Sequence, residues 1–250
     1  MLKKILQHLN ILIIITLVWY LVTESEVFSI ILLPTPKSVF IALATLLPGN
    51  GLYLDIFTTL YRMTVGLIIG IITGIMLGLI MSSSKKIYNT AEFWLDFLRS
   101  IPAPALVPLF LLFFGIGDIS KIALTIFVTA LLVAINTVYG VLNSKESRIM
   151  AGKTIGLSKR EILLKIILPD SLPYISSGIR VAISFAMVVV VVSEMIIGAN
   201  YGLGRKIIDY QLMFQTANMY AVIILTGILG YTFNKLYLIF EKRYIHWMGK

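Results

Sequence analysis

The chain has 250 residues, of which 58% are hydrophobic and 13% charged, and its mean hydropathy is +0.95. A soluble domain carries about 25% charged residues, so this composition excludes an ordinary soluble protein and predicts one that lies mostly in lipid. The absence of cysteine excludes a disulfide framework and a thiolate metal site. The formal charge of +9 falls in short loops between apolar runs, which is typical of orientation in a membrane rather than of nucleic-acid binding.

Six apolar runs are each near the ~20 residues that a helix needs to cross ~30 Å of hydrocarbon. They predict an all-α polytopic membrane protein with a single domain over 1–250. The first run is not followed by a small-x-small cleavage site, so we expect it to stay as an anchor. The third run is short and broken by prolines. The expected spans are 9–23, 63–82, 101–116, 119–142, 173–197 and 217–240.

Basic residues are distributed unevenly between the two sides that these spans define. Lysine and arginine concentrate in the cytoplasmic loops of membrane proteins. If the N-terminus is cytoplasmic, most of the 21 basic residues fall inside. This bias predicts that both termini and the segment 143–172 are cytoplasmic. The basic residues expected outside are Lys37, Arg62, Lys121, Arg205 and Lys206.

The longest outer loop is expected over 24–62, where Leu33-Pro34-Thr35-Pro36 prevents a continuous helix. Residues 37–47 then predict a short amphipathic helix. It either lies at the membrane interface or only packs on the bundle.

Glycines at every fourth position mark the second expected span: Gly66, Gly70, Gly74 and Gly78. Such a stripe lets another helix backbone approach closely. It predicts a multi-helix bundle and is compatible with fixed packing or with a moving interface.

Three prolines, Pro102, Pro104 and Pro108, follow Arg99 at the start of the third expected span. Each removes a backbone donor, and irregular backbone at membrane depth needs cover from protein or a water-filled cavity. The segment either lines a path through the bundle or is a distorted helix entry at the cytoplasmic interface.

The segment 144–169 is the longest charged stretch between apolar runs, and it predicts two short helices. Asn143 or Ser144 is expected to cap a helix over 145–155, with Gly156 in the left-handed position after it. Ser158 and Glu161 form a capping-box pattern that starts a second helix at 159. This helix is expected to end at Leu168, before Pro169. Alternatively, this second helix lies at the membrane interface, where its basic side chains contact anionic lipid.

This segment resembles the signature loop of permease subunits of binding-protein-dependent ABC importers. That loop reads Glu-Ala-Ala, three residues, Gly, nine residues, Ile-x-Leu-Pro. Ala151, Gly156 and Ile166-Ile167-Leu168-Pro169 match at full spacing, whereas Met150 replaces the Glu and Gly152 the second Ala. The resemblance assigns ATPase coupling to Ala151, Gly152, Gly156, Leu157, Ser158, Glu161, Ile166, Leu168 and Pro169.

Further stretches resemble the sulfonate, taurine and nitrate branch of this family. They are Leu33-Pro34-Thr35-Pro36, the segment from Arg99 through 121, and Ser193-Glu194-Met195 followed by Gly202-Leu203-Gly204. The resemblance implies a type I importer permease for a small, anionic solute.

The resemblance also implies the partners. Two cytoplasmic ATPase subunits would bind ATP and Mg²⁺, a second permease copy would form a homodimer, and an extracytoplasmic binding protein would deliver the solute. The chain itself has no G-x-x-x-x-G-K-[ST] sequence, no metal-ligand cluster and no paired carboxylates, so we expect no catalytic, cofactor or metal site.

Polar residues within the expected spans are few, and some of them are candidates for the translocation path. Glu194 is near the outer end of its span, where it is either part of the path or a solvated or interhelical carboxylate. The candidates, with the two prolines, are Pro102, Pro104, Asn136, Ser184, Ser193 and Glu194.

Two other functions remain as alternatives. A self-sufficient secondary transporter or channel predicts inverted repeats and several buried charges, and the sequence shows neither. A scaffold protein would bind a partner through 143–172 without moving a solute.

Overall fold

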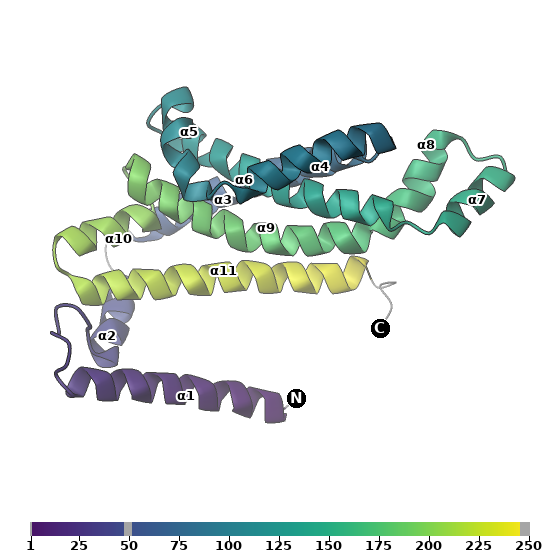
Figure 1. The fold of residues 1–250 in the computed structure, drawn as a ribbon. Helices are drawn as coiled ribbons and strands as arrows, with labels where there is room; N and C mark the ends of the chain where they lie inside the picture. The colour runs from purple at the N-terminus through teal and green to yellow at the C-terminus, as the bar shows by residue number, and fades with distance from the viewer. Residues whose placement is uncertain (1, 48–51, 246–250) are drawn as a thin grey trace.

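The computed structural model describes residues 2–47 and 52–245, with side chains described from residue 10 onward. Every regular element in these ranges is helical, as the sequence predicts (Figure 1). The helices are α1 Leu2–Glu24, α2 Pro36–Leu46, α3 Leu52–Met81, α4 Lys85–Ser100, η1 Ala103–Leu106, α5 Val107–Phe114, α6 Asp118–Leu142, α7 Glu146–Thr154, α8 Lys159–Ile162, η2 Leu163–Ile167, α9 Leu168–Ile197, α10 Leu203–Leu212 and α11 Thr216–Tyr244.

Four helical stretches in the described residues are long and apolar enough to cross a membrane: α3, α6, α11 and the continuous run Lys159–Ile197 that contains α9. A fifth candidate is the bent pair of α4 with Ala103–Phe114. The first expected span, 9–23, falls within the helix α1, whose described side chains, Asn10–Glu24, are largely apolar. Among the described residues, the structure therefore supports four or five spans by length and composition, where the sequence predicted six over the whole chain.

The centre of the bundle is α6, which packs along both α3 and α9. The four-residue glycine stripe of α3 faces α6 along this contact. A Cβ on Gly66 would lie 2.6 Å from Cβ of Thr125, and a Cβ on Gly70 would lie 2.6 Å from Cβ of Thr129. The two backbones can approach this closely only because the stripe carries no side chains.

On the other side of α6, α9 also approaches closely at a glycine. A Cβ on Gly178 would lie 2.6 Å from Cβ of Asn136. Met63, Val133 and Ala186, from three different helices, belong to one buried apolar cluster. Packing of apolar side chains, together with these close approaches, holds the three helices together.

The N-terminal helix α1 lies apart from the bundle and reaches it through α2 (Figure 1). Trp19 Nε1 donates to the carbonyl oxygen of Pro34 at 3.0 Å. The Trp19 and Tyr220 rings stack with their centroids 6.2 Å apart. Thr35 caps α2 by accepting a hydrogen bond from the backbone N–H of Ser38, so the Leu-Pro-Thr-Pro sequence ends one element and starts the next.

The expected third span, 101–116, is not one straight helix. α4 ends at Ser100, and the chain turns by 90° before Ala103–Phe114. Pro102 lacks an N–H and keeps Ile101 extended, at φ −77° and ψ 121°, so the helix cannot continue. The sequence assigned no helix to the residues of α4, which starts at Ser84, whose side chain accepts from the N–H of Ile87.

The second expected span, 63–82, begins too late, because its helix α3 starts at Leu52 and includes Arg62, which the sequence placed in the first outer loop. Arg62 is in α3 and is 3% exposed, and Lys121 is in α6 and is fully buried. Each has polar partners within the bundle: Arg62 pairs with carboxylates, and Lys121 Nζ donates to the carbonyl oxygen of Gly117 at 2.8 Å. Partners of this kind let a helix extend beyond its apolar run.

Candidate functional site

The candidate site is the segment from Lys145 to Asp170, called here the coupling segment, which comprises α7, α8, η2 and the first residues of α9. It lies at one end of the bundle, and α10 lies at the other (Figure 1). The residue before α7 is Lys145, which makes no side-chain cap. The expected caps were wrong because Asn143 Nδ2 and Ser144 Oγ donate back to carbonyl oxygens of α6, those of Tyr139 and Gly140.

A left-handed glycine and a capping box set the angle between α7 and α8. Gly156 has φ +82°, and the N–H of Leu157 donates to the carbonyl oxygen of Gly152 at 3.0 Å, as in a Schellman motif. Ser158 Oγ then accepts from the Glu161 N–H at 3.3 Å, and Glu161 Oε2 accepts from the Ser158 N–H at 3.0 Å. The capping box that the sequence predicts is therefore present.

The carboxylate of Glu161 stays ionised in this arrangement. Its strongest interaction is with Lys165, whose Nζ lies 2.9 Å from Oε1. Together with the bonds from Ser158, this lowers the pKa of Glu161 to about 2. The capping box is therefore charged throughout the physiological pH range.

The second helix does not stop at Leu168, contrary to the prediction. Residues Leu163–Ile167 form a π-helical turn, in which the Leu168 N–H donates to the carbonyl oxygen of Leu163. Pro169 directly follows this turn as the second residue of α9, and the helix continues through the proline. The coupling segment consequently passes into a spanning helix without a loop.

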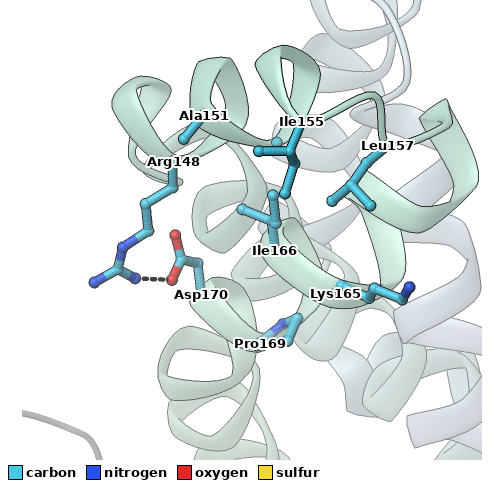
Figure 2. A pocket seen from close by; sticks show the side chains of 9 residues that line it. Arg148, Ala151, Ile155, Leu157, Lys165, Ile166, Pro169 and Asp170 are labelled. Atoms are coloured by element: carbon cyan, nitrogen blue, oxygen red, sulfur yellow. Dashed lines mark hydrogen bonds and ion pairs between the residues drawn. The ribbon is translucent and has the colours of Figure 1, made fainter.

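An open groove of about 680 Å³ lies between α7 and the start of α9 (Figure 2). α7 approaches η2 closely, because a Cβ on Gly152 would lie 2.5 Å from Cδ1 of Ile166. The floor is apolar and the charged side chains of Arg148, Lys165 and Asp170 stand around it. The lining residues are Arg148, Ala151, Gly152, Ile155, Leu157, Lys165, Ile166, Pro169 and Asp170.

An ion pair that the sequence analysis missed connects the two walls of this groove. Arg148 Nη1, from α7, pairs with Asp170 Oδ1, from α9 (Figure 2). The side chain of Asp170 is 14% exposed and that of Arg148 is 55% exposed. The only signal in the sequence was that Asp170 directly follows the Leu-Pro end of the motif.

The predicted coupling residues divide into two groups in the structure. Gly156, Ser158, Glu161 and Leu168 shape the backbone. The others line the groove: Ala151, Gly152, Leu157, Ile166 and Pro169.

The predicted path residues do not come together within one chain. Pro102 and Pro104 line an apolar cavity of about 220 Å³ between the α4–α5 bend and α9. Ser184 lines a separate groove of about 490 Å³ between α9 and α11. Asn136 packs against Gly178, and its Nδ2 donates to the carbonyl oxygen of Leu132 at 2.8 Å.

The remaining two path candidates, Ser193 and Glu194, are fully buried. Ser193 Oγ donates to the carbonyl oxygen of Val190 at 2.8 Å. Glu194 is an interhelical carboxylate, one of the two interpretations that the sequence left open, with Thr59 and Arg62 of α3 as partners.

Comparison with known proteins identifies the family to which the chain belongs. Residues 66–246 match the family described as the inner membrane component of binding-protein-dependent transport systems. The chain belongs to this family. Its members are permease subunits of ABC transporters that have no catalytic activity of their own, because ATP hydrolysis takes place in a separate subunit. Membership implies a multi-pass membrane protein with an ATPase and a binding protein as partners.

Two named relatives cover nearly the whole chain. The putative aliphatic sulfonates transport permease protein SsuC of Escherichia coli (strain K12) is 30% identical over 233 residues, covering 93% of this chain and 88% of its own. The taurine transport system permease protein TauC of the same organism is 26% identical over 253 residues, covering 99% and 92%.

A solved structure shares the fold. A chain of the MetNI methionine ABC transporter in an inward-facing conformation matches with a TM-score of 0.64 at 22% identity, covering 80% of this chain and 96% of that chain. The chain thus has the fold of an ABC importer permease.

Proposed function

We propose that this permease forms the translocation path for a small anionic solute, a sulfonate such as taurine or a chemically related anion. The relatives named for aliphatic sulfonates and taurine support this solute class. The low content of acidic residues, 12 in 250, also suits an anion. In this proposal a binding protein delivers the solute from outside, and both termini and the coupling segment face the cytoplasm.

The coupling segment is the observation that carries the mechanism. Its groove presents an apolar floor to a partner, and Ile155, 76% exposed, and Met150, 58% exposed, extend this apolar surface. The ATPase would dock here and bind ATP and Mg²⁺ itself. Because η2 joins α9 without a loop, a movement of the docked partner would be passed directly to α9.

A second copy of the chain would complete the path. In one chain the polar candidates face different cavities, and the Pro102–Pro104 cavity is lined almost entirely by apolar side chains. Two copies that meet along the α4–α5 bend would enclose a path between them, with the bent backbone covered by protein as irregular backbone at membrane depth requires.

The test is reconstitution of the chain in proteoliposomes with its ATPase subunits and binding protein. Gly156→Val forces a β-branched residue into φ +82° and is expected to lower solute-stimulated ATP hydrolysis at least tenfold. Gly156→Asn is the matched control, because asparagine tolerates the left-handed region, and it should stay near the wild type.

Three outcomes would contradict the proposal. Coupling that survives Gly156→Val would reject the role of the segment. Uptake driven by an ion gradient with the chain alone would favour a secondary transporter. Stimulation by other solutes but not by taurine or alkanesulfonates would reject the solute class.

A further inference from the structure

A polar cluster, buried except for Asp118, whose side chain is 50% exposed, joins three spanning helices at the end of the bundle opposite the coupling segment. Arg62 of α3 is at its centre, and its Nη1 donates to Glu194 Oε1 of α9 at 2.6 Å. Its Nε and Nη2 donate to Asp118 Oδ1 of α6 at 2.9 and 2.6 Å. The guanidinium also donates to the carbonyl oxygen of Tyr201 at 2.9 Å. One arginine therefore connects α3, α6, α9 and the loop before α10.

The same cluster holds the first turn of α10. The N–H of Gly202 donates to Asp55 Oδ1 at 2.7 Å. The N–H of Leu203 donates to Thr59 Oγ1 at 2.9 Å, and that of Gly204 to Glu194 Oε2 at 2.9 Å. These N–H groups have no partner within their own helix, and carboxylates are favourable at this end of the helix dipole. Side chains of α3 and α9 thus act as the cap of α10.

The two glycines of this turn are required by contact with the cluster. Gly202 has φ +145°, and a Cβ on it would lie 2.5 Å from Cδ of Glu194. A Cβ on Gly204 would overlap the carbonyl oxygen of Val191. The Gly-Leu-Gly sequence is therefore matched to Glu194 across the helix contact. We call Asp55, Thr59, Arg62, Asp118 and Glu194 the far-end cluster.

The other end of α10 is held differently. Leu212, Met213 and Phe214 are all exposed, and Phe214 has φ +55°, a conformation that non-glycine residues rarely adopt. Strained backbone of this kind is concentrated at segments that move or bind. α10 is consequently fixed at its start to α3 and α9, packs along α11 through Ile207, and is joined to α11 at its end by an exposed, strained turn.

We propose that the far-end cluster is a clamp that makes α10 move together with α3 and α9 during transport, with Arg62 and Glu194 as its positioning residues. The inference rests on the proposed function, because it takes the coupling segment as the origin of the movement. α9 runs unbroken for 30 residues from η2 past Glu194, so a displacement of its first turn reaches the cluster.

The clamp can be tested by following α10 directly. The chain has no native cysteine, so Gln211→Cys, at an exposed site on α10, carries a single spin label. In the reconstituted complex with its ATPase and binding protein, addition of ATP is expected to change the label spectrum. Glu194→Gln keeps the size of the side chain but loses the charge that pairs with Arg62. It should make the label at least twofold more mobile, abolish the ATP-dependent change and lower solute uptake at least tenfold, while the complex still assembles.

A control and a second variant keep the test decisive. Arg205→Gln removes the partly exposed Arg205–Asp209 pair on the same helix, at 2.6 Å, without changing the charge of Asp209, and should change neither mobility nor uptake. If Glu194→Gln does not assemble, Arg62→Lys keeps the charge but cannot bridge Glu194, Asp118 and Tyr201 together, and the same loss is expected from it.

Two results would overturn the clamp: unchanged label mobility in both variants, or increased mobility with unchanged uptake. A wild-type complex without ATP-stimulated uptake would instead count against the proposed function. The mobility comparison needs neither nucleotide nor solute and still decides whether the cluster holds α10.

Discussion

The two ends of the bundle hold their charged side chains in different ways. In the coupling segment, Glu161 finds Ser158 and Lys165 within four residues, and its ion pair with Lys165 is exposed, with side chains 42% and 62% accessible. In the far-end cluster, Arg62 and Glu194 are 132 residues apart in sequence and 4% and 0% accessible. One end is organised by local hydrogen bonds in water, and the other by long-range pairing inside the bundle.

This difference shows which charges can be changed without loss of the fold. An exposed pair contributes little because water solvates either partner when the other is removed. A buried pair leaves an uncompensated charge when it is broken. We therefore expect substitutions at the far end to act on the whole bundle, and substitutions in the coupling segment to act on local structure and on the contact with the partner.

The largest effect is expected from Arg62→Ala, which strands Glu194 and removes the connection between α3, α6 and α9. It should lower the free energy of unfolding by about 3–5 kcal/mol. Arg205→Ala, which breaks the exposed pair with Asp209, is the control and should cost less than about 1 kcal/mol. Denaturant titration of the purified chain in detergent measures both. Equal losses of unfolding free energy in the two variants would contradict the expected difference between buried and exposed ion pairs.

The next effect tests the middle of the bundle, where close packing replaces charge. Gly70→Ala places a Cβ 2.6 Å from Cβ of Thr129, so α3 and α6 must separate, at a cost of about 1–3 kcal/mol. Gly227→Ala, where the new Cβ meets no atom within 4 Å, should instead stabilise α11 by about 0.5–1 kcal/mol. The same titration measures both, and a loss in both variants would contradict the packing argument.

A smaller and local effect is expected from Ser158→Ala, which removes the cap of α8. The loss is about 1 kcal/mol and confined to the coupling segment. Hydrogen exchange should become faster at the amides of 158–162, while α9 and the far end stay protected. Ser147→Ala, at an exposed position of α7, is the control. Faster exchange throughout α9 would mean that the two ends are not separable.

The smallest effect is the response of the coupling segment to pH. The pKa of Glu161 is about 2, below its ordinary 4.5, so the stability it gives is complete above about 4.5 and is lost as the pH falls through about 2. Exchange rates of 158–162, corrected for the intrinsic pH dependence, should therefore stay constant between about pH 5 and 8. A transition within that window would show that Glu161 is not held by Lys165 and Ser158.

Sequence reasoning succeeded where a signal is local. The left-handed Gly156 and the Ser158–Glu161 capping box were predicted because each depends on residues within one or two turns. The prediction that the second helix ends before Pro169 was wrong, because the π-helical turn that lets the helix continue has no recognisable pattern in the sequence. Sequence reasoning also failed at Arg62, since apolarity alone was used to place the start of the second expected span.

A signal for the far-end cluster was present but was not used. Arg62 continues the four-residue spacing of the stripe that begins at Gly66, and Thr59 and Asp55 lie on the same helical face one and two turns earlier. The spacing indicates which face turns inward. It does not indicate that Glu194 and Asp118 meet that face.

The sequence by itself determined the all-helical membrane character, the capped two-helix coupling segment and the family. Composition and short-range hydrogen bonding decide these features, and both can be read along the chain. Only the tertiary structure decided that α9 is continuous with the coupling segment and that Arg62 joins three spanning helices to α10. Those features depend on which helices become neighbours, and in lipid that choice follows from close packing and from the need of each buried charge for a partner.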